Sequence, residues 1–163
     1  MGSDSIAIII GSDHAAFALK QWVKSYLEKR GIPVEDAGVH SEQSADYPAY
    51  ARAVAGRVSS GEFRRGILLC GTGLGMSMAA NRFPNVRAAL CNDLFSAKMS
   101  RLHNDANILV LGGRVIGDVL AGAIVDTWLD TDFEGGRHQR RLDMFDRIET
   151  LNDTPEAGAT GKK

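Results

Sequence analysis

The sequence predicts a three-layer α/β protein, in which a doubly wound sheet of about five parallel strands lies between two layers of helices. Short apolar segments rich in branched residues alternate along the chain with longer amphipathic segments, an order typical of strand–helix–strand units with parallel strands. The 18 glycines gather at a few points, several of them directly after a predicted strand. In a parallel sheet these loops are the ones that bind ligands.

Each element follows from local spacing. Ile6–Ile10 is an apolar run closed by Gly11, and it predicts a first strand buried on both faces. Ala15–Arg30 carries apolar residues at helical spacing before Gly31, which is typical of a helix end. The other predicted strands are Ile32–Asp36, Gly66–Cys70, Arg87–Cys91 and Ile108–Leu111. The other predicted helices are Pro48–Ser60, a short helix from the loop Gly71–Gly75 to Asn81, Leu94–Leu102, Asp118–Asp130 and Arg137–Leu151. This order predicts a Rossmann-like architecture.

Length and composition limit the class of protein. The 163 residues suit one domain, expected over residues 1–152, followed by a flexible tail at Asp153–Lys163. With 19 Lys+Arg against 20 Asp+Glu, the chain shows no footprint of nucleic-acid binding. Its apolar runs are too short to cross a membrane. Two cysteines cannot form a disulfide framework, and the four histidines lack zinc-site spacing, so we expect a cytoplasmic protein without metal or cofactor.

The loop Cys70–Gly75 has the densest functional pattern. It places a thiol at a strand end, then three alternating glycines whose amides can point into one concavity, then a helix N-terminus. That pattern is typical of anion binding. It is neither a dinucleotide fingerprint nor a cysteine-phosphatase loop, because the third glycine of the first and the arginine of the second would both fall on Met76. The alternative is a tight turn whose glycines serve packing alone.

The side chains around this loop also have two interpretations. Cys70 is either a small buried hydrophobe or a thiolate held by the following amides, and its position favours the second, whereas Cys91 has no glycines after it and is expected to be structural. Arg137 and Arg141 are four residues apart on a predicted helix, so they can hold one anion or form a solvated basic face. His103 ends a predicted helix and could simply cap it.

Six ordered motifs together resemble the type B ribose-5-phosphate isomerases, a group that includes the galactose-6-phosphate isomerase subunits. They are Ile6–His14, Asp46–Pro48, Gly66–Gly75, Ser100–Asp105, Leu111–Arg114 and Glu134–Arg141. The resemblance extends from Ile6 to about Glu149. It implies an aldose–ketose isomerase of a phosphorylated sugar, above all one that interconverts ribose 5-phosphate and ribulose 5-phosphate by proton transfer through an enediolate.

The resemblance also implies roles for individual residues. Cys70 is the expected base, His103 the acid that opens the sugar ring, and Thr72 a further catalytic group. Some members carry the base as a glutamate slightly further along the glycine loop, where this chain has Leu74, Gly75 and Met76, so Cys70 inherits the role. The expected substrate-binding residues are Asp13, His14, Tyr47, Gly71, Gly73, Leu74, Gly75, Asn104, Arg114, Arg137 and Arg141. The partner is expected to be a second copy, in a homodimer or a dimer of dimers whose sites combine Cys70 of one chain with His103 of the other.

Two other classes of function stay open on the sequence alone. One is a non-catalytic phosphate-binding or nucleotide-binding domain, which the glycine loop by itself would satisfy. The other is a subunit that acts only within a hetero-oligomer. Within the isomerases, tetrose 4-phosphates and hexose 6-phosphates remain alternative substrates, because one methylene more or less changes binding by roughly 1–3 kcal/mol.

Overall fold

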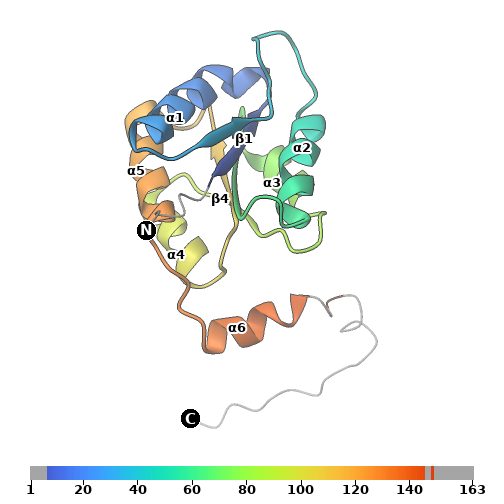
Figure 1. Ribbon diagram of the computed structural model, residues 1–163, viewed down its shortest axis with the longest axis vertical. Helices are drawn as coiled ribbons and strands as arrows, with labels where there is room; N and C mark the ends of the chain where they lie inside the picture. Colours follow the sequence, from blue (N-terminus) through green and yellow to red (C-terminus); the bar gives the residue numbers. More distant parts are fainter. Residues whose placement is uncertain (1–6, 146–147, 149–163) are drawn as a thin grey trace.

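The computed structural model describes residues 7–145 and 148 and confirms the predicted fold class. Its centre is a parallel sheet of five strands in the order β2-β1-β3-β5-β4. The strands are β1 (Ile8–Ser12), β2 (Val34–Asp36), β3 (Arg65–Cys70), β4 (Ala88–Leu90) and β5 (Ile108–Gly112). A short 3-10 helix at His14–Ala16 precedes the helices α1 (Phe17–Lys29), α2 (Tyr47–Ser59), α3 (Leu74–Ala80), α4 (Leu94–Leu102), α5 (Asp118–Leu129) and α6 (Arg137–Leu142) (Figure 1).

Two hydrophobic cores lie on the two faces of the sheet. Ile8 and Ile10 point into a core that α1, α4 and α5 cover and that includes the fully buried Trp128. Ile9 points the other way, into a core that α2 and α3 cover. This alternation is what a strand buried on both faces requires. It gives the three layers that the sequence predicts.

The first strand begins two residues later than predicted and includes Gly11. A Cβ on Gly11 would lie 2.9 Å from Cγ2 of Val54, and one on Gly66 of the neighbouring strand would lie 2.9 Å from Cγ1 of the same valine. The two glycines therefore let α2 pack close against β1 and β3. The prediction that Gly11 closes the strand was wrong, because the residue serves helix–sheet packing. Ile6, the predicted start, lies outside the described residues.

The last helix, α6, stands apart from the three layers. It follows Gly135 and Gly136, whose φ angles are +69° and +56°, and Figure 1 shows it as a separate segment at one end of the molecule. It ends at Leu142, whereas the prediction extended it to Leu151; positions 146, 147 and 149–163 lie outside the described residues, together with the expected tail.

No described helix could span a bilayer. The longest, α1 and α2, have 13 residues each, against the roughly 20 apolar residues that a transmembrane helix needs.

Both edge strands have only three residues, and side chains hold each of them. At the β4 edge, the Asn81 side-chain amide donates to the Ala88 carbonyl at 2.9 Å and accepts from the Ala88 N–H at 2.8 Å. At the β2 edge, the amine of the fully buried Lys20 donates to Asp36 Oδ1 and to the Val39 carbonyl, both at 2.6 Å.

The environment of Asp36 favours its charged form. Burial by itself would raise the pKa of this carboxyl, but hydrogen bonds from Lys20 and the Gly38 amide, with the charges of Lys20 and Lys24, outweigh it and hold the pKa below its ordinary value. The carboxylate thus ties β2 to α1 and to the loop that follows β2.

Candidate functional site

The loops at the C-terminal edge of the sheet meet beside the point where the strand order reverses. Connections from β1 lead to β2 on one side, whereas β3 leads to β4 and β5 on the other, so the crevice between β1 and β3 is the expected ligand site of this fold. Backbone hydrogen bonds join three loops there. The Asp13 amide donates to the Leu69 carbonyl at 3.2 Å, the Gly113 amide to Cys70 at 2.8 Å and the Arg114 amide to Gly71 at 2.9 Å.

Cys70 ends β3 at this crevice, and its side chain is 5% exposed. The Gly73 amide donates to Cys70 Sγ at 3.1 Å, which turns the loop back over the sulfur. Gly73 has a φ of +81°, and a Cβ there would lie 2.4 Å from Cδ1 of Leu90, so this position requires glycine. Thr72 and Leu74 lie exposed on the outer side of the loop, where the Leu74 amide donates to Thr72 Oγ1 at 3.3 Å.

Tyr47 comes to the same loop from α2. It is the first residue of that helix, and its ring covers Gly75 so closely that a Cβ on Gly75 would lie 2.7 Å from Cζ of the tyrosine. The two glycines that let α2 approach the sheet therefore also bring this phenol to the crevice. Tyr47 is 39% exposed, so it is not part of the hydrophobic core.

Asp13 and His14 lie at the end of β1. Asp13 is buried and caps the 3-10 helix, accepting from the Ala16 amide at 3.2 Å. Nδ1 of His14 accepts a hydrogen bond from the Ala45 amide at 3.1 Å. A ring nitrogen that accepts carries no proton, so Nε2 is the donor of this imidazole. Arg114 lies beside the glycine loop, since a Cβ on Gly71 would lie 3.6 Å from Cδ of this arginine.

The remaining predicted residues lie at the opposite, N-terminal edge of the sheet. His103 follows α4, which starts after β4 and runs back toward the beginning of β5. The loop after it is fixed at that edge, because the Asn107 amide donates to the Arg87 carbonyl at 3.1 Å and the Asn107 carbonyl accepts from the Gly66 amide at 2.9 Å. Asn104 is exposed in this loop. Cys70 and His103 are therefore not brought together within one chain.

Arg137 and Arg141 belong to this second edge as well. Both are exposed on α6, whose six helical residues confirm their placement one turn apart. The Glu134 amide donates to the Leu102 carbonyl at 3.0 Å, which fixes the start of the α6 segment beside the end of α4. The predicted site residues thus form two groups, one at each edge of the sheet.

Glu134 and His138 join the second group, although they were not among the predicted residues. The His138 and His103 rings stack with their centroids 4.2 Å apart and their planes 11° apart. Glu134 Oε2 lies 3.4 Å from His138 Nε2 and 3.9 Å from His103 Nε2. Burial lowers the pKa of His138, and the neighbouring His103 and Arg137 lower it further. The sequence signal that could have identified His138 is its position four residues before Leu142, which places both side chains on one face of a helix.

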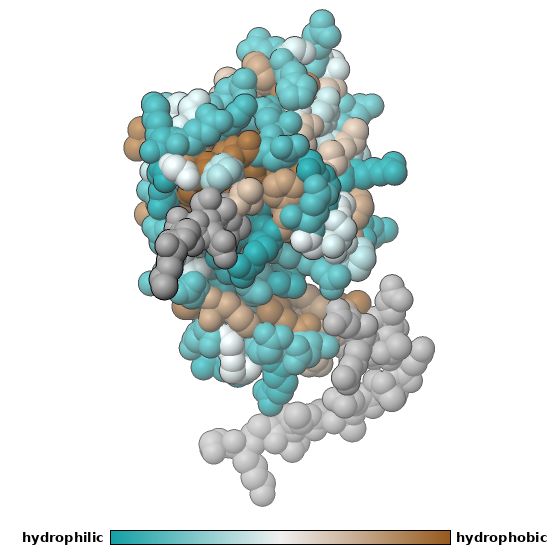
Figure 2. Space-filling view, in the orientation of Figure 1, coloured by the Kyte–Doolittle hydropathy of each residue, from teal (hydrophilic) through white to brown (hydrophobic). Residues whose placement is uncertain are grey.

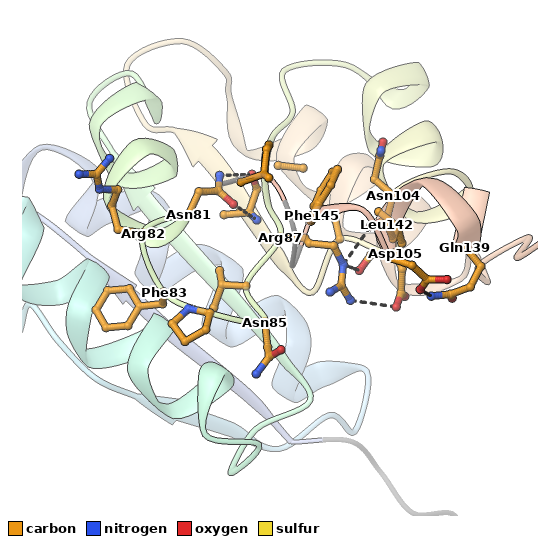
Figure 3. A pocket seen from close by; sticks show the side chains of 17 residues that line it. Asn81, Arg82, Phe83, Asn85, Arg87, Asn104, Asp105, Gln139, Leu142 and Phe145 are labelled. Atoms are coloured by element: carbon orange, nitrogen blue, oxygen red, sulfur yellow. Dashed lines mark hydrogen bonds and ion pairs between the residues drawn. The ribbon is translucent and has the colours of Figure 1, made fainter. Parts of the chain in front are cut away.

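A large groove of the described residues lies elsewhere, between α6 and the β4 edge. It encloses about 1030 Å³, and Figure 3 shows the ion pair at its centre, where Arg87 Nη2 lies 3.0 Å from Asp105 Oδ2. Leu142, Phe145 and Ile148 line its α6 side, and Figure 2 shows apolar surface where α6 meets the rest of the molecule. No residue of the glycine loop lines this groove, and Asn104 is its one predicted site residue.

Large apolar side chains are exposed around the C-terminal edge. Phe95 is 73% exposed at the start of α4, and Val119 is 82% exposed at the start of α5. Leu74, Met78, Leu94 and Val115 are also exposed. Helices α3, α4 and α5 all begin at this edge, and grouped exposed apolar residues are typical of an interaction surface.

Comparison with known proteins gives consistent similarities over nearly the whole described chain. The profile of the family described as Ribose/Galactose Isomerase matches residues 8–145. The ribose-5-phosphate isomerase B of Escherichia coli K12 is 49% identical over 142 residues, which are 87% of this chain and 95% of that protein. A D-erythrulose-4-phosphate isomerase of Pectobacterium atrosepticum is 43% identical over 132 residues, covering 80% of this chain and 87% of the relative.

A solved structure agrees with these similarities. The crystal structure of a ribose 5-phosphate isomerase from Thermotoga maritima superposes with a TM-score of 0.85 at 58% identity, covering 87% of this chain and 98% of the other. The region matched by the family profile contains both groups of site residues, from Asp13 to Arg141.

Proposed function

Because the chain belongs to the Ribose/Galactose Isomerase family, we propose that it interconverts ribose 5-phosphate and ribulose 5-phosphate. The observation that carries this proposal is the position of Cys70, a thiol at the crevice between β1 and β3 whose sulfur accepts the Gly73 amide at 3.1 Å. A thiolate accepts such a bond more strongly than a neutral thiol does. Neither a passive anion-binding loop nor a packing turn would need this sulfur.

Cys70 is the base of the proposed reaction. In the direction from aldose to ketose, its thiolate takes the proton from C2, and the released electron pair forms the enediolate while the C1 oxygen gains negative charge. The thiol then returns this proton to C1, and the C2 hydroxyl passes its own proton to the C1 oxygen, so that C2 becomes the ketone and C1 becomes a CH2OH group. Since Gly73 is engaged with the sulfur, the amides of Gly71 and Gly75, with Thr72, are the proposed donors to the enediolate oxygen.

His103 acts before this step, by giving a proton to the ring oxygen of the cyclic sugar. Asp13, Tyr47 and Asn104 bind sugar hydroxyls, and Leu74 closes the outer side of the loop. His14, Arg114, Arg137 and Arg141 hold the phosphate, whose binding orients the far end of the sugar. These roles draw on residues from both edges of the sheet.

We therefore propose that the site is completed by a second copy of the chain, in a homodimer or a dimer of dimers. The C-terminal edge of one copy faces the His103 and α6 side of the other. Two observations support this arrangement. The separation of the two groups leaves each edge with only part of the machinery, and the exposed Phe95 and Val119 offer an apolar surface beside the glycine loop. A two-fold axis then gives two equivalent sites per dimer.

A screen of the purified chain alone, with aldose phosphates of four to six carbons, tests the substrate. We expect the highest kcat/KM with ribose 5-phosphate. A higher value with a tetrose 4-phosphate would assign the chain to the activity that the Pectobacterium relative is named for, and a higher value with a hexose 6-phosphate would favour the galactose branch. Activity that requires another protein would indicate a hetero-oligomer, and phosphate binding without turnover would contradict the isomerase.

We also propose a cytoplasmic location. Both cysteines are free and buried, which suits a reducing compartment. Fractionation of cells that express the chain, with a cytoplasmic marker enzyme measured in parallel, tests this.

A further inference from the structure

We propose that His103, Glu134 and His138 form a binding site for a divalent transition-metal ion such as Zn²⁺, and that the ion inhibits the enzyme when bound. Among the described residues these three are the one group in which ligand atoms of three such side chains all lie within 4.8 Å of one another. Two imidazoles and one carboxylate are a donor set that suits zinc and its neighbours in the first transition row.

The buried histidine is the independent observation that points to a ligand. His138 is 4% exposed, and its Nε2 has no hydrogen-bond partner among the described residues. A buried polar atom without a partner carries a free-energy cost of about 1–3 kcal/mol. The unpaired nitrogen faces Glu134 Oε2 at 3.4 Å, and a shared cation would satisfy both atoms.

The distances between the ligand atoms of these three side chains are compatible with binding of one ion. Ligand atoms about 2.1 Å from a tetrahedral zinc ion stand roughly 3.4 Å apart, close to the 3.4 Å and 3.9 Å that separate Glu134 Oε2 from the two Nε2 atoms. The two rings lie nearly parallel, so one must tilt before both nitrogens can point at the same ion. The His103 side chain is 36% exposed at the end of α4 and has room to do so.

The site leaves a coordination position open to solvent, since Glu134 is 47% exposed. It also lies beside Arg137 and Arg141, whose positive charges oppose a dication. We therefore expect a reversibly bound ion. Its effect rests on the proposed function: the ion would occupy the nitrogen with which His103 protonates the sugar ring, so binding would slow turnover.

Binding and inhibition are measured separately. Competition with a chromophoric chelator gives the affinity for Zn²⁺, and we expect His138→Gln and Glu134→Gln each to weaken it by at least about tenfold, the lower end of losses at metal sites. His40→Gln is the matched control, because His40 is an exposed histidine outside this cluster, and it should bind like the wild type. Glu134→Gln changes an exposed side chain, so it keeps the test valid if His138→Gln fails to fold.

The absorption spectrum with Co²⁺ identifies the ligands. We expect d–d bands of a nitrogen–oxygen site in the wild type; a sulfur-to-cobalt charge-transfer band would show that a cysteine holds the ion and would overturn the proposal. Equal Zn²⁺ affinity of the wild type and both cluster variants would overturn it as well.

For the wild type and for each variant, the activity measured with Zn²⁺ is compared with the activity of the same protein in the presence of a chelator. We expect Zn²⁺ to inhibit the wild type over the range in which it binds, and His138→Gln to need at least about tenfold more. Binding without inhibition would overturn the inhibitory role. It would leave the isomerase assignment intact, because that assignment is judged by turnover without metal.

Discussion

Cys70 ends β3 and Cys91 follows β4, and their two buried sulfur atoms have different hydrogen-bond partners. Cys70 Sγ accepts a hydrogen bond from the Gly73 amide, whereas Cys91 Sγ lies 3.6 Å from the Ala89 carbonyl, to which only a protonated sulfur can donate. Burial is the main cause that raises the pKa of Cys91 to about 11, so this sulfur stays a neutral thiol at pH 7. Cys91 is therefore a control, within the same chain, for the proposed role of the Cys70 sulfur.

Cys70→Ala is expected to lower kcat by at least about 100-fold, the usual minimum contribution of a general base. Binding of ribitol 5-phosphate, a substrate analogue without the carbonyl, should stay near the wild-type value because the phosphate groups are untouched. Steady-state kinetics and calorimetry measure the two quantities. Cys91→Ala should keep kcat and lose only stability, on the order of 1 kcal/mol. If Cys70→Ala retained more than about a tenth of kcat, the base would be another group.

Arg137→Ala and Arg141→Ala are expected to raise KM for the phosphorylated sugar by about tenfold or more, since a charge-assisted hydrogen bond contributes roughly 1.5–3 kcal/mol. Activity on free ribose, however low, should barely change. Arg52→Ala is the matched control, because Arg52 is an exposed arginine on α2 and belongs to neither group of site residues. Equal losses on both sugars would mean that the two arginines support the fold or the assembly instead.

At the scale of elements, the C-terminal group of the site followed from the strands alone. A parallel sheet brings the ends of its strands to one edge, so Asp13, Cys70 and Arg114 could be predicted to lie together. The stacking of His103 on His138 could not, because it depends on how the end of α4 packs against α6, 35 positions later in the chain. The end of β1 was also misplaced, since only the packed structure shows Val54 against Gly11.

The buried pair of Lys20 and Asp36 gives a prediction about an edge strand. Lys20→Met leaves a buried carboxylate without its main partner and is expected to cost about 3 kcal/mol at pH 7. Lys24→Met removes a half-exposed amine 3.7 Å from the same carboxyl and should cost under about 1 kcal/mol. Urea unfolding at a series of pH values measures both losses.

The pH dependence follows from the lowered pKa of Asp36. A carboxyl with a lower pKa in the folded state stabilises the protein above its unfolded pKa of about 3.9, and this contribution is lost as the pH falls through the folded value. The stability difference between the wild type and Lys20→Met should therefore be full near pH 6 and shrink below about pH 4. A difference that stayed constant down to pH 3 would contradict the role of the ion pair.

For the whole molecule, the main fact is that the candidate site is divided between the two edges of one sheet. The topology forces this, because a residue that ends a strand and one that ends the following helix lie at opposite edges. Figure 1 shows α6 at one end of the molecule and the segment before α2 at the other. Within one copy, Arg141 and Cys70 therefore lie at different edges of the sheet.

Mixed dimers test this arrangement. Cys70→Ala and His103→Ala chains, each nearly inactive, are unfolded together and refolded as a mixture. Random pairing makes about half of the dimers mixed, and each mixed dimer holds one intact site and one doubly altered site, so about a quarter of the wild-type activity should return. Recovery should follow the mixed-dimer content measured by native mass spectrometry. Mixed dimers without recovered activity would show that each site lies within one chain or that one residue has another role.

The pairing of Asn81 with Ala88 at the β4 edge also determines how copies can associate. A bare edge strand can template another strand, and that process repeats without limit, as it does in fibres. Here a side-chain amide already occupies the outward N–H and C=O of Ala88 in a strand of only three residues, so a sheet cannot grow from this edge in regular register. In the proposed dimer, contacts between copies would therefore be made by side chains on helices and loops, where a symmetric pair saturates its own surface and assembly stops at a finite size.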